Sequence, residues 1–156
     1  MTPVRVVLIV AAISTGLFTG LLMTILAFFQ RVLKDLTAPE FTLVIQRFLG
    51  VVRTHPLHYG LVITSVLAPV VALLLLRGSA GSPAFLLILA GLVSFFAVLA
   101  SRYFVEPVYD IFLSWEVEAP PGNWRAARDR YFGLNVIRGI GSGAAFVLLL
   151  ISLSLL

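Results

Sequence analysis

Four long apolar runs constrain this chain more than any other feature, at about residues 6–29, 58–76, 84–104 and 134–156. Each run approaches or exceeds the roughly 20 residues that an α-helix needs to cross about 30 Å of hydrocarbon. Backbone groups in lipid must be satisfied within the protein, and no alternating barrel pattern is present, so the runs predict helices. A short turn from Arg77 to Pro83 makes the second and third helices antiparallel. The sequence therefore predicts an all-α, integral membrane, antiparallel four-helix bundle, formed as one domain over residues 1–156.

The composition and the placement of charge agree with a membrane protein. Of the 156 residues, 60% are hydrophobic and 12% are charged, whereas soluble domains carry about 25% charged residues. All basic residues except Arg5 and Arg77 lie at the ends of the runs that meet on one side of the membrane. Basic residues near spans favour the cytoplasm. We therefore expect a bacterial inner-membrane protein with both termini outside and the two longer loops cytoplasmic, and no nucleic-acid partner.

A shorter helix is predicted between the first two runs. The segment from Thr37 to Glu40 is a capping box with a proline in the first turn. It opens a helix over about residues 38–53 that is too short and too charged to span a bilayer. We expect this amphipathic juxtamembrane helix to lie at the interface or against protruding ends of other helices.

Those protruding ends are also predicted by the pattern. The third run continues in helical pattern past Phe104 as far as Trp115, and Pro107 is expected to kink it. Asn123 is a suitable N-cap for a helix that continues without a break into the fourth run. Three helices should therefore extend beyond the bilayer at the same end.

A polar seam enters the fourth run. Its members recur every three or four residues and so share one helix face: Arg128, Tyr131, Asn135, Arg138 and Ser142. An arginine at the bilayer centre costs roughly 2.5–3.5 kcal/mol on insertion scales, so the seam needs partners. Two interpretations of Arg138 stay open. It either snorkels to the interface, since the run after it is uncharged and long enough to span, or is buried and bonded to Asn135 and a carboxylate of the third helix.

Small residues indicate which helices approach closely. Gly16 and Gly20 form a GxxxG motif in the first run, and Gly139 and Gly143 form another in the fourth. Such motifs let helix backbones come together in lipid. They indicate packing of the first run against the fourth.

Two carboxylates at the end of the third run are candidates to join the seam. Glu106 and Asp110 lie four residues apart, which places them on one helix face. Their simplest role is that of counter-ion to Arg102, Arg138 or another arginine at that end. Together with two histidines they would also provide the ligand types of a nitrogen–oxygen metal site.

The histidines do not require such a site. Pro56 disfavours helical geometry at His55, which weakens the case for a ligand pair with His58. The simpler interpretation has Thr54 or His55 as the helix cap and His58 at the headgroup level. The chain has no cysteine, so thiolate sites are excluded, and no metal site is predicted. The candidate site residues are Arg138, Asn135, His58, Glu106 and Asp110.

These motifs resemble the anthrone-oxygenase-like family of small four-helix membrane proteins. The likeness covers the whole chain and is loose in the first half. There it consists of a first run with Gly16 and Gly20, followed by a juxtamembrane helix with Gln46. Its more specific part begins at Pro107 and continues through Asn123-Trp124 to the stretch Arg130-Tyr-Phe-Gly-Leu-Asn-Val-Ile-Arg138. The family typically shows an arginine–aromatic pair, a polar residue and then an arginine at this spacing. Here Tyr131 stands where tryptophan is common, and Asp110 where asparagine is common.

The resemblance implies the four-helix fold and, for some fungal members, oxygenation of anthrones without an obvious cofactor; most bacterial members are unassigned. One function class is therefore a membrane enzyme or binder for a flat hydrophobic molecule such as an aromatic polyketide or a quinone. The five candidates would form its polar end, remove a proton and stabilise an enolate. The other class is a non-catalytic accessory subunit of a larger membrane complex, in which the seam fixes helix register. A transporter is disfavoured, since no inverted repeat or pair of broken helices is evident.

Overall fold

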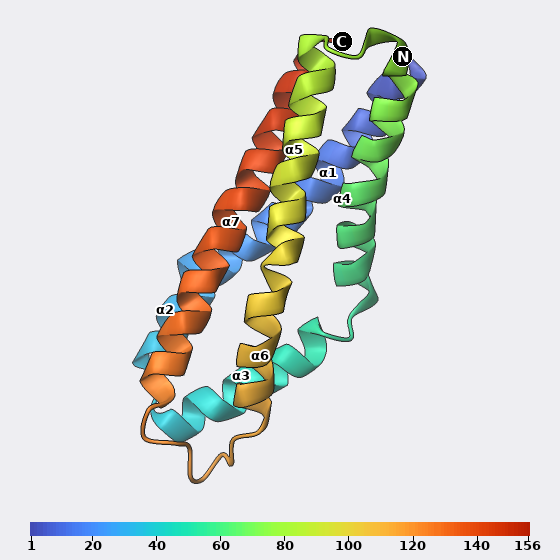
Figure 1. Cartoon of the computed structure of the whole chain (residues 1–156). Helices are drawn as coiled ribbons and strands as arrows, with labels where there is room; N and C mark the ends of the chain where they lie inside the picture. Colours follow the sequence, from blue (N-terminus) through green and yellow to red (C-terminus); the bar gives the residue numbers. More distant parts are fainter.

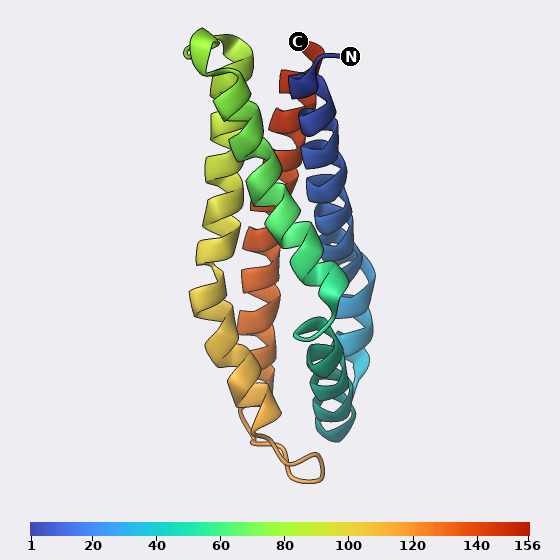
Figure 2. The ribbon, with the colours of Figure 1, turned by 90° about the vertical axis from the view of Figure 1, so that its right-hand side faces the viewer.

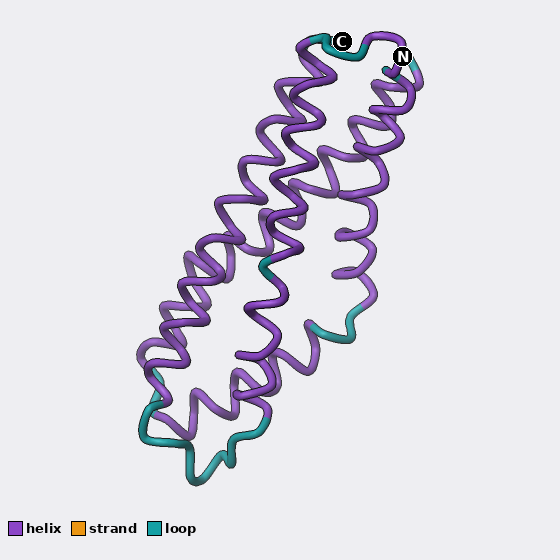
Figure 3. Tube along the Cα trace, viewed as in Figure 1, coloured by secondary structure: helices purple, strands orange, loops and turns teal.

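The structure is a computed structural model that describes residues 1–156. It contains helices and connecting turns and no strand, which confirms the all-α class (Figure 3). The helical elements are α1 (Pro3–Thr24), the π-helical turn η1 (Ile25–Phe29), α2 (Gln30–Asp35), α3 (Ala38–Val52), α4 (Pro56–Leu75), the short 3₁₀ turn η2 (Arg77–Ser79), α5 (Pro83–Ala100), α6 (Arg102–Leu113) and α7 (Trp124–Ser154).

Four helical stretches are long and apolar enough to cross a membrane. They are Pro3–Asp35 with 33 residues, Pro56–Leu75 with 20, Pro83–Leu113 with 31 and Trp124–Ser154 with 31. A 20-residue helix is about 30 Å long, which matches the hydrocarbon thickness. The other three stretches are longer than that thickness requires. The protein thus has the helices of an integral membrane protein.

The long helices lie side by side (Figures 1 and 2). Both termini and the α4–α5 connection lie at one end of the molecule, whereas α3 and the α6–α7 connection lie at the other, which we call the α3 end (Figures 1 and 2). Helix contacts join α5 to α7, α1 to α4, α1 to α7 and α4 to α5. The predicted packing of the first run against the fourth is therefore confirmed.

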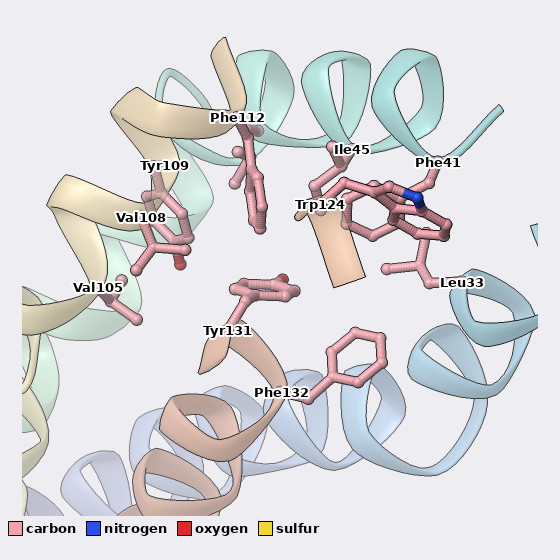
Figure 4. Close-up of a cluster of buried hydrophobic side chains, with 11 residues drawn as sticks. Leu33, Phe41, Ile45, Val105, Val108, Tyr109, Phe112, Trp124, Tyr131 and Phe132 are labelled. Atoms are coloured by element: carbon pink, nitrogen blue, oxygen red, sulfur yellow. The ribbon is translucent and has the colours of Figure 1, made fainter. Parts of the chain in front are cut away.

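Helix α3 is held at the α3 end by its cap and by an aromatic cluster. The Glu40 carboxylate accepts hydrogen bonds from the backbone N–H and the hydroxyl of Thr37, at 2.8 and 2.6 Å, and these bonds lower the pKa of Glu40. The ring of Phe41 packs against Phe112 and Trp124, with centroids 5.5 and 5.4 Å apart (Figure 4). Helix 38–53 was thus predicted to within one residue, and it packs against α6 as expected of a helix that meets protruding ends.

The largest core cluster of the molecule lies at this end. It joins α2, α3, α6 and α7 through 11 buried residues, which are Leu33, Phe41, Ile45, Leu49, Val105, Val108, Tyr109, Phe112, Trp124, Tyr131 and Phe132. Figure 4 shows Tyr131 in the middle of the cluster, and its ring centroid lies 5.8 Å from that of Phe112 and 5.9 Å from that of Phe132. The ring of the seam residue Tyr131 is therefore held in place by aromatic packing.

Glycines set the close approaches of α7 to its neighbours. A Cβ on Gly16 of α1 would lie 2.8 Å from the Phe146 ring, whereas a Cβ on Gly20 would meet nothing within 4 Å, so only half of that motif is used in packing. On α7, Gly139 faces Leu26 of η1, and Gly141 faces α5, where a Cβ would lie 2.8 Å from Val98. Helix α7 thus uses successive glycines against two different helices.

Two local features differ from the sequence prediction. The helix through the third run is interrupted at Ser101, six residues before Pro107, and Pro107 itself lies inside α6. Proline disturbs the turn that precedes it, and the Ser101 hydroxyl bonds back to the Val98 carbonyl, a contact that tends to bend helices. The π-helical turn at Ile25–Phe29 was not predicted, because no proline or glycine marks it.

The contact of Gly141 with α5 generates a stability prediction. We expect Gly141→Leu to destabilise the protein by about 1–3 kcal/mol, because the new side chain must displace the stiff, buried Val98. The matched control is Gly133→Leu on the same helix, where a Cβ meets nothing within 4 Å and leucine has the higher helix propensity. Thermal unfolding in detergent micelles measures both. Equal stability of the two variants would contradict the assigned α5–α7 contact.

Candidate functional site

A small cavity lies between the helices near the α3 end, with a volume of ≈ 60 Å³. Of its 19 lining residues, 13 are hydrophobic, and every helix except α2 contributes. The apolar walls come mainly from α1, α3, α4 and α5. The other six lining residues are Arg53, His58, Arg102, Glu106, Asn135 and Arg138, and three of the 13, Tyr59, Tyr109 and Tyr131, also carry hydroxyl groups.

The seam of α7 forms one side of this cavity. The Nη1 group of Arg138 donates to the Tyr109 hydroxyl at 3.1 Å and, at 3.5 Å, to Oδ1 of Asn135. Because a guanidinium can only donate, the amide oxygen must face Arg138, which leaves the amide nitrogen of Asn135 free. That Nδ2 atom and Nε of Arg138 are buried and have no hydrogen-bond partner. Asn135 itself is 1% exposed, so it is shielded from bulk solvent.

His58 brings a third unpartnered polar atom to the same cavity. It lies in the first turn of α4, its ring packs 5.7 Å from that of Phe18 on α1, and its buried Nδ1 makes no hydrogen bond. His55, in contrast, accepts a hydrogen bond from the Leu57 backbone N–H at 3.3 Å and caps α4, as one sequence interpretation expected. No group of three or more His, Asp or Glu side chains lies close enough together to hold a metal ion.

The two carboxylates of α6 are engaged by other arginines. Glu106 bridges Arg53 and Arg102, at 2.6 and 2.7 Å, and Asp110 accepts from Arg53 at 3.1 Å. The predicted counter-ion role of the carboxylates is thus observed, but not toward Arg138. The expectation that a buried Arg138 bonds a carboxylate is wrong, because Arg53 at the end of α3 occupies both acids and leaves Arg138 with neutral partners.

Four of the five predicted site residues meet at the cavity, namely Arg138, Asn135, His58 and Glu106. Asp110 does not line it and instead borders an adjacent, more open groove with a volume of ≈ 690 Å³. This groove runs along α5 and α6 and is lined by Phe96, Leu99, Ala100, Arg102, Tyr103, Glu106, Pro107 and Asp110. It shares Leu99, Arg102 and Glu106 with the cavity. The cavity and the groove therefore adjoin at these three residues.

Arg53, Tyr59 and Tyr109 line the cavity but were not predicted as site residues. Arg53 was used only to predict the membrane orientation. Its place at the end of an amphipathic helix, and the spacing of Glu106 and Asp110 on one face of another, are compatible with the ion pairs that Arg53 forms with both carboxylates. Tyr59 donates its hydroxyl to the Arg53 carbonyl at 2.6 Å and fixes the α3–α4 corner. Gln46 donates to the carbonyls of Phe112 and Trp115, both at 2.9 Å, and so anchors α3 to the end of α6. The Arg53 and Gln46 pairings join α3 to the distant α6, and no spacing in the sequence shows them.

The cavity combines hydrogen-bond donors with little space. Nδ2 of Asn135 and Nε of Arg138 can only donate, so the group that satisfies them must carry an oxygen or another acceptor. A volume of ≈ 60 Å³ admits water or a small polar group, whereas a cavity that binds benzene is about 150 Å³. An aromatic ring therefore does not fit inside it without movement of the side chains.

The ion-pair network generates a second stability prediction. We expect Glu106→Gln to destabilise the protein by about 1–3 kcal/mol, because Glu106 is 23% exposed and its loss leaves two arginines without their shared carboxylate. Asp110→Asn is the matched control and should cost at most about 1 kcal/mol, since that side chain is 67% exposed. Denaturant unfolding in micelles measures the difference. A larger loss for Asp110→Asn would show that Glu106 is not the bridging group.

Comparison with known proteins adds no relative to this description. Protein-family models, curated proteins and solved structures all yield no match to the chain. The function is therefore inferred from the arrangement of the cavity itself, where three buried polar atoms on two helices lack partners beside a set of three arginines and one carboxylate.

Proposed function

We propose that the protein binds a flat hydrophobic molecule, aromatic or quinone-like, with its polar end in the cavity at the α3 end. The observation that carries this proposal is the convergence of three buried, unpartnered polar atoms on one cavity: Arg138 Nε, Asn135 Nδ2 and His58 Nδ1. Leaving such atoms unpaired costs about 1–3 kcal/mol each, so a ligand or water that bonds them is strongly favoured. Apolar walls with a few convergent polar groups are typical of small-molecule sites.

The resemblance to the anthrone-oxygenase-like family extends this proposal to chemistry. In an oxygenation of that kind, His58 is the group suited to remove a proton from the bound molecule, because it is the titratable base with a free ring nitrogen. Arg138 and Asn135 would stabilise the negative charge on the resulting enolate oxygen, since both present unused donors. No cofactor is part of the proposal.

We also propose the membrane arrangement that the charge distribution supports. The four helices cross the bilayer as an antiparallel bundle, with the α3 end in the cytoplasm and both termini outside. All basic residues except Arg5 and Arg77 belong to the α3 end. Because basic residues near spans favour the cytoplasmic side, this distribution supports a cytoplasmic α3 end. A bacterial inner membrane is the compartment that suits this topology.

The small cavity favours a second candidate, an accessory subunit of a larger membrane complex. With ≈ 60 Å³ of space, the polar residues can be satisfied by water alone, and the seam then fixes the register of α6 against α7. The two candidates differ in what accompanies the protein out of the membrane, which is a small molecule in the first and another membrane protein in the second.

Native mass spectrometry of the protein extracted from its own membranes separates the two. The wild type and the control Asn123→Leu, whose side chain is exposed and makes no capping bond, should retain a small molecule. The variant Asn135→Leu should lose it, because the buried amide donor is gone. A wild type that carries no small molecule but a stoichiometric membrane protein would refute the binding proposal and support the accessory subunit.

The topology is testable because the chain has no cysteine of its own. We expect a cysteine placed at Ala119, in the exposed α6–α7 connection, to react with a membrane-impermeant maleimide only after the cells are opened. A cysteine at Ser79, in the exposed α4–α5 connection, should react in intact cells. The opposite labelling pattern would invert the proposed orientation, and equal labelling of both would exclude it.

A further inference from the structure

The cavity has more positive than negative charge. Three arginines line it, Arg53, Arg102 and Arg138, against the single carboxylate of Glu106. Glu106 is already shared between Arg53 and Arg102, and Arg138 has only the neutral Tyr109 hydroxyl and Asn135 amide as partners. A partly buried guanidinium without a counter-ion is unfavourable. The charge that is missing is a negative one beside Arg138.

The unpartnered donor atoms of Arg138 and Asn135 also indicate which kind of anionic group fits the cavity. Nε of Arg138 and Nδ2 of Asn135 are both donors that lie on the wall of the same cavity, and both are buried without a partner. Two donors of this kind match a group with two oxygen acceptors, as in the pairing of a guanidinium with a carboxylate. A neutral carbonyl oxygen has two lone pairs and can accept from both donors, but it leaves the charge of Arg138 uncompensated.

The volumes of the cavity and the groove indicate where each end of an amphiphilic ligand can lie. The cavity of ≈ 60 Å³ admits a carboxylate but no ring, whereas the adjacent groove has ≈ 690 Å³. The groove contributes Phe96, Ala100, Tyr103 and Pro107 as a wall for an apolar body, and it adjoins the cavity at Leu99 and the Arg102–Glu106 ion pair.

From charge, donors and space together we propose that the ligand is an amphiphilic carboxylate. Its carboxylate bonds Arg138 and Asn135 in the cavity, and its apolar body lies in the groove along α5 and α6. This inference rests on the proposed binding function and narrows its substrate class to acids. It assigns the free donors of Arg138 and Asn135 to the carboxylate in place of an enolate oxygen. It makes Arg138 the residue that distinguishes an acid from its neutral analogue.

The test compares naphthoate with its uncharged methyl ester, by calorimetry on the protein in phosphatidylcholine nanodiscs, with the heat of empty nanodiscs subtracted. We expect the wild type to bind naphthoate about 10- to 100-fold more tightly than the ester, the range expected for charge-assisted hydrogen bonds. Arg138→Gln should abolish this preference, and Arg138→Lys should keep part of it. Arg130→Gln is the matched control on the same helix, since Arg130 is exposed and has no hydrogen bond or ion pair. Thermal unfolding verifies that each variant is folded.

The outcomes distinguish this inference from the proposal on which it rests. Equal affinity of the wild type for acid and ester would overturn the carboxylate assignment and leave the hydrophobic binding site intact. Binding of neither probe would overturn both. Retention of phosphatidylglycerol by the wild type after extraction, lost in Arg138→Gln, would assign the cavity to a lipid head group and refute a free carboxylate ligand.

Discussion

The placement of a half-buried Arg138 beside neutral partners is the constraint around which the α3 end is organised. A guanidinium that enters a membrane helix must be satisfied by the protein, and here the Tyr109 hydroxyl and the Asn135 amide provide hydrogen bonds without charge. Tyr109 is itself held by ring contact with Tyr131, with centroids 5.9 Å apart. The hydrogen bond from Arg138 to Tyr109 therefore depends on the aromatic cluster that packs α6 against α7. Helix α3 completes this cluster with Phe41, Ile45 and Leu49.

The carboxylates of α6 show how one distant residue changes the chemistry of a site. If Arg53 were absent, Glu106 would be available to another arginine at the cavity. Arg53 is placed there by the length of α3 and by the Tyr59 hydroxyl on its carbonyl, and it binds both Glu106 and Asp110. The result is a cavity in which the negative charge lies on the α3–α6 side and an uncompensated donor set lies on α7. That asymmetry is the basis of both the proposed function and the proposed preference for acids.

Close helix packing makes the cavity small and leaves an open space outside it. Gly139 and Gly141 bring α7 against η1 and α5, and Gly91 of α5 lies so close to α7 that a Cβ would be 3.3 Å from the Ala145 carbonyl. With the helices in such proximity, the interior has room for a polar group only. The interruption at Ser101 lies beside the groove, where α5 gives way to α6. The fold therefore offers a small interior cavity with a polar end and a larger groove outside it, and the two adjoin at the Arg102–Glu106 pair.

The sequence alone determined the helices, because each depends on local chemistry. Apolar runs defined the four spans, the Thr37–Glu40 capping box began α3, and the spacing of Tyr131, Asn135 and Arg138 placed them on one face. It also selected four of the residues that line the cavity. Only the tertiary structure decided the pairing: Arg53 rather than Arg138 binds Glu106, Gly16 rather than Gly20 meets α7, and the third helix breaks at Ser101 rather than at Pro107. The physical reason is that helical periodicity and capping act within a few residues. An ion pair or a close helix approach depends instead on which distant side chains the tertiary fold brings together, and the spacing along one chain does not contain that information.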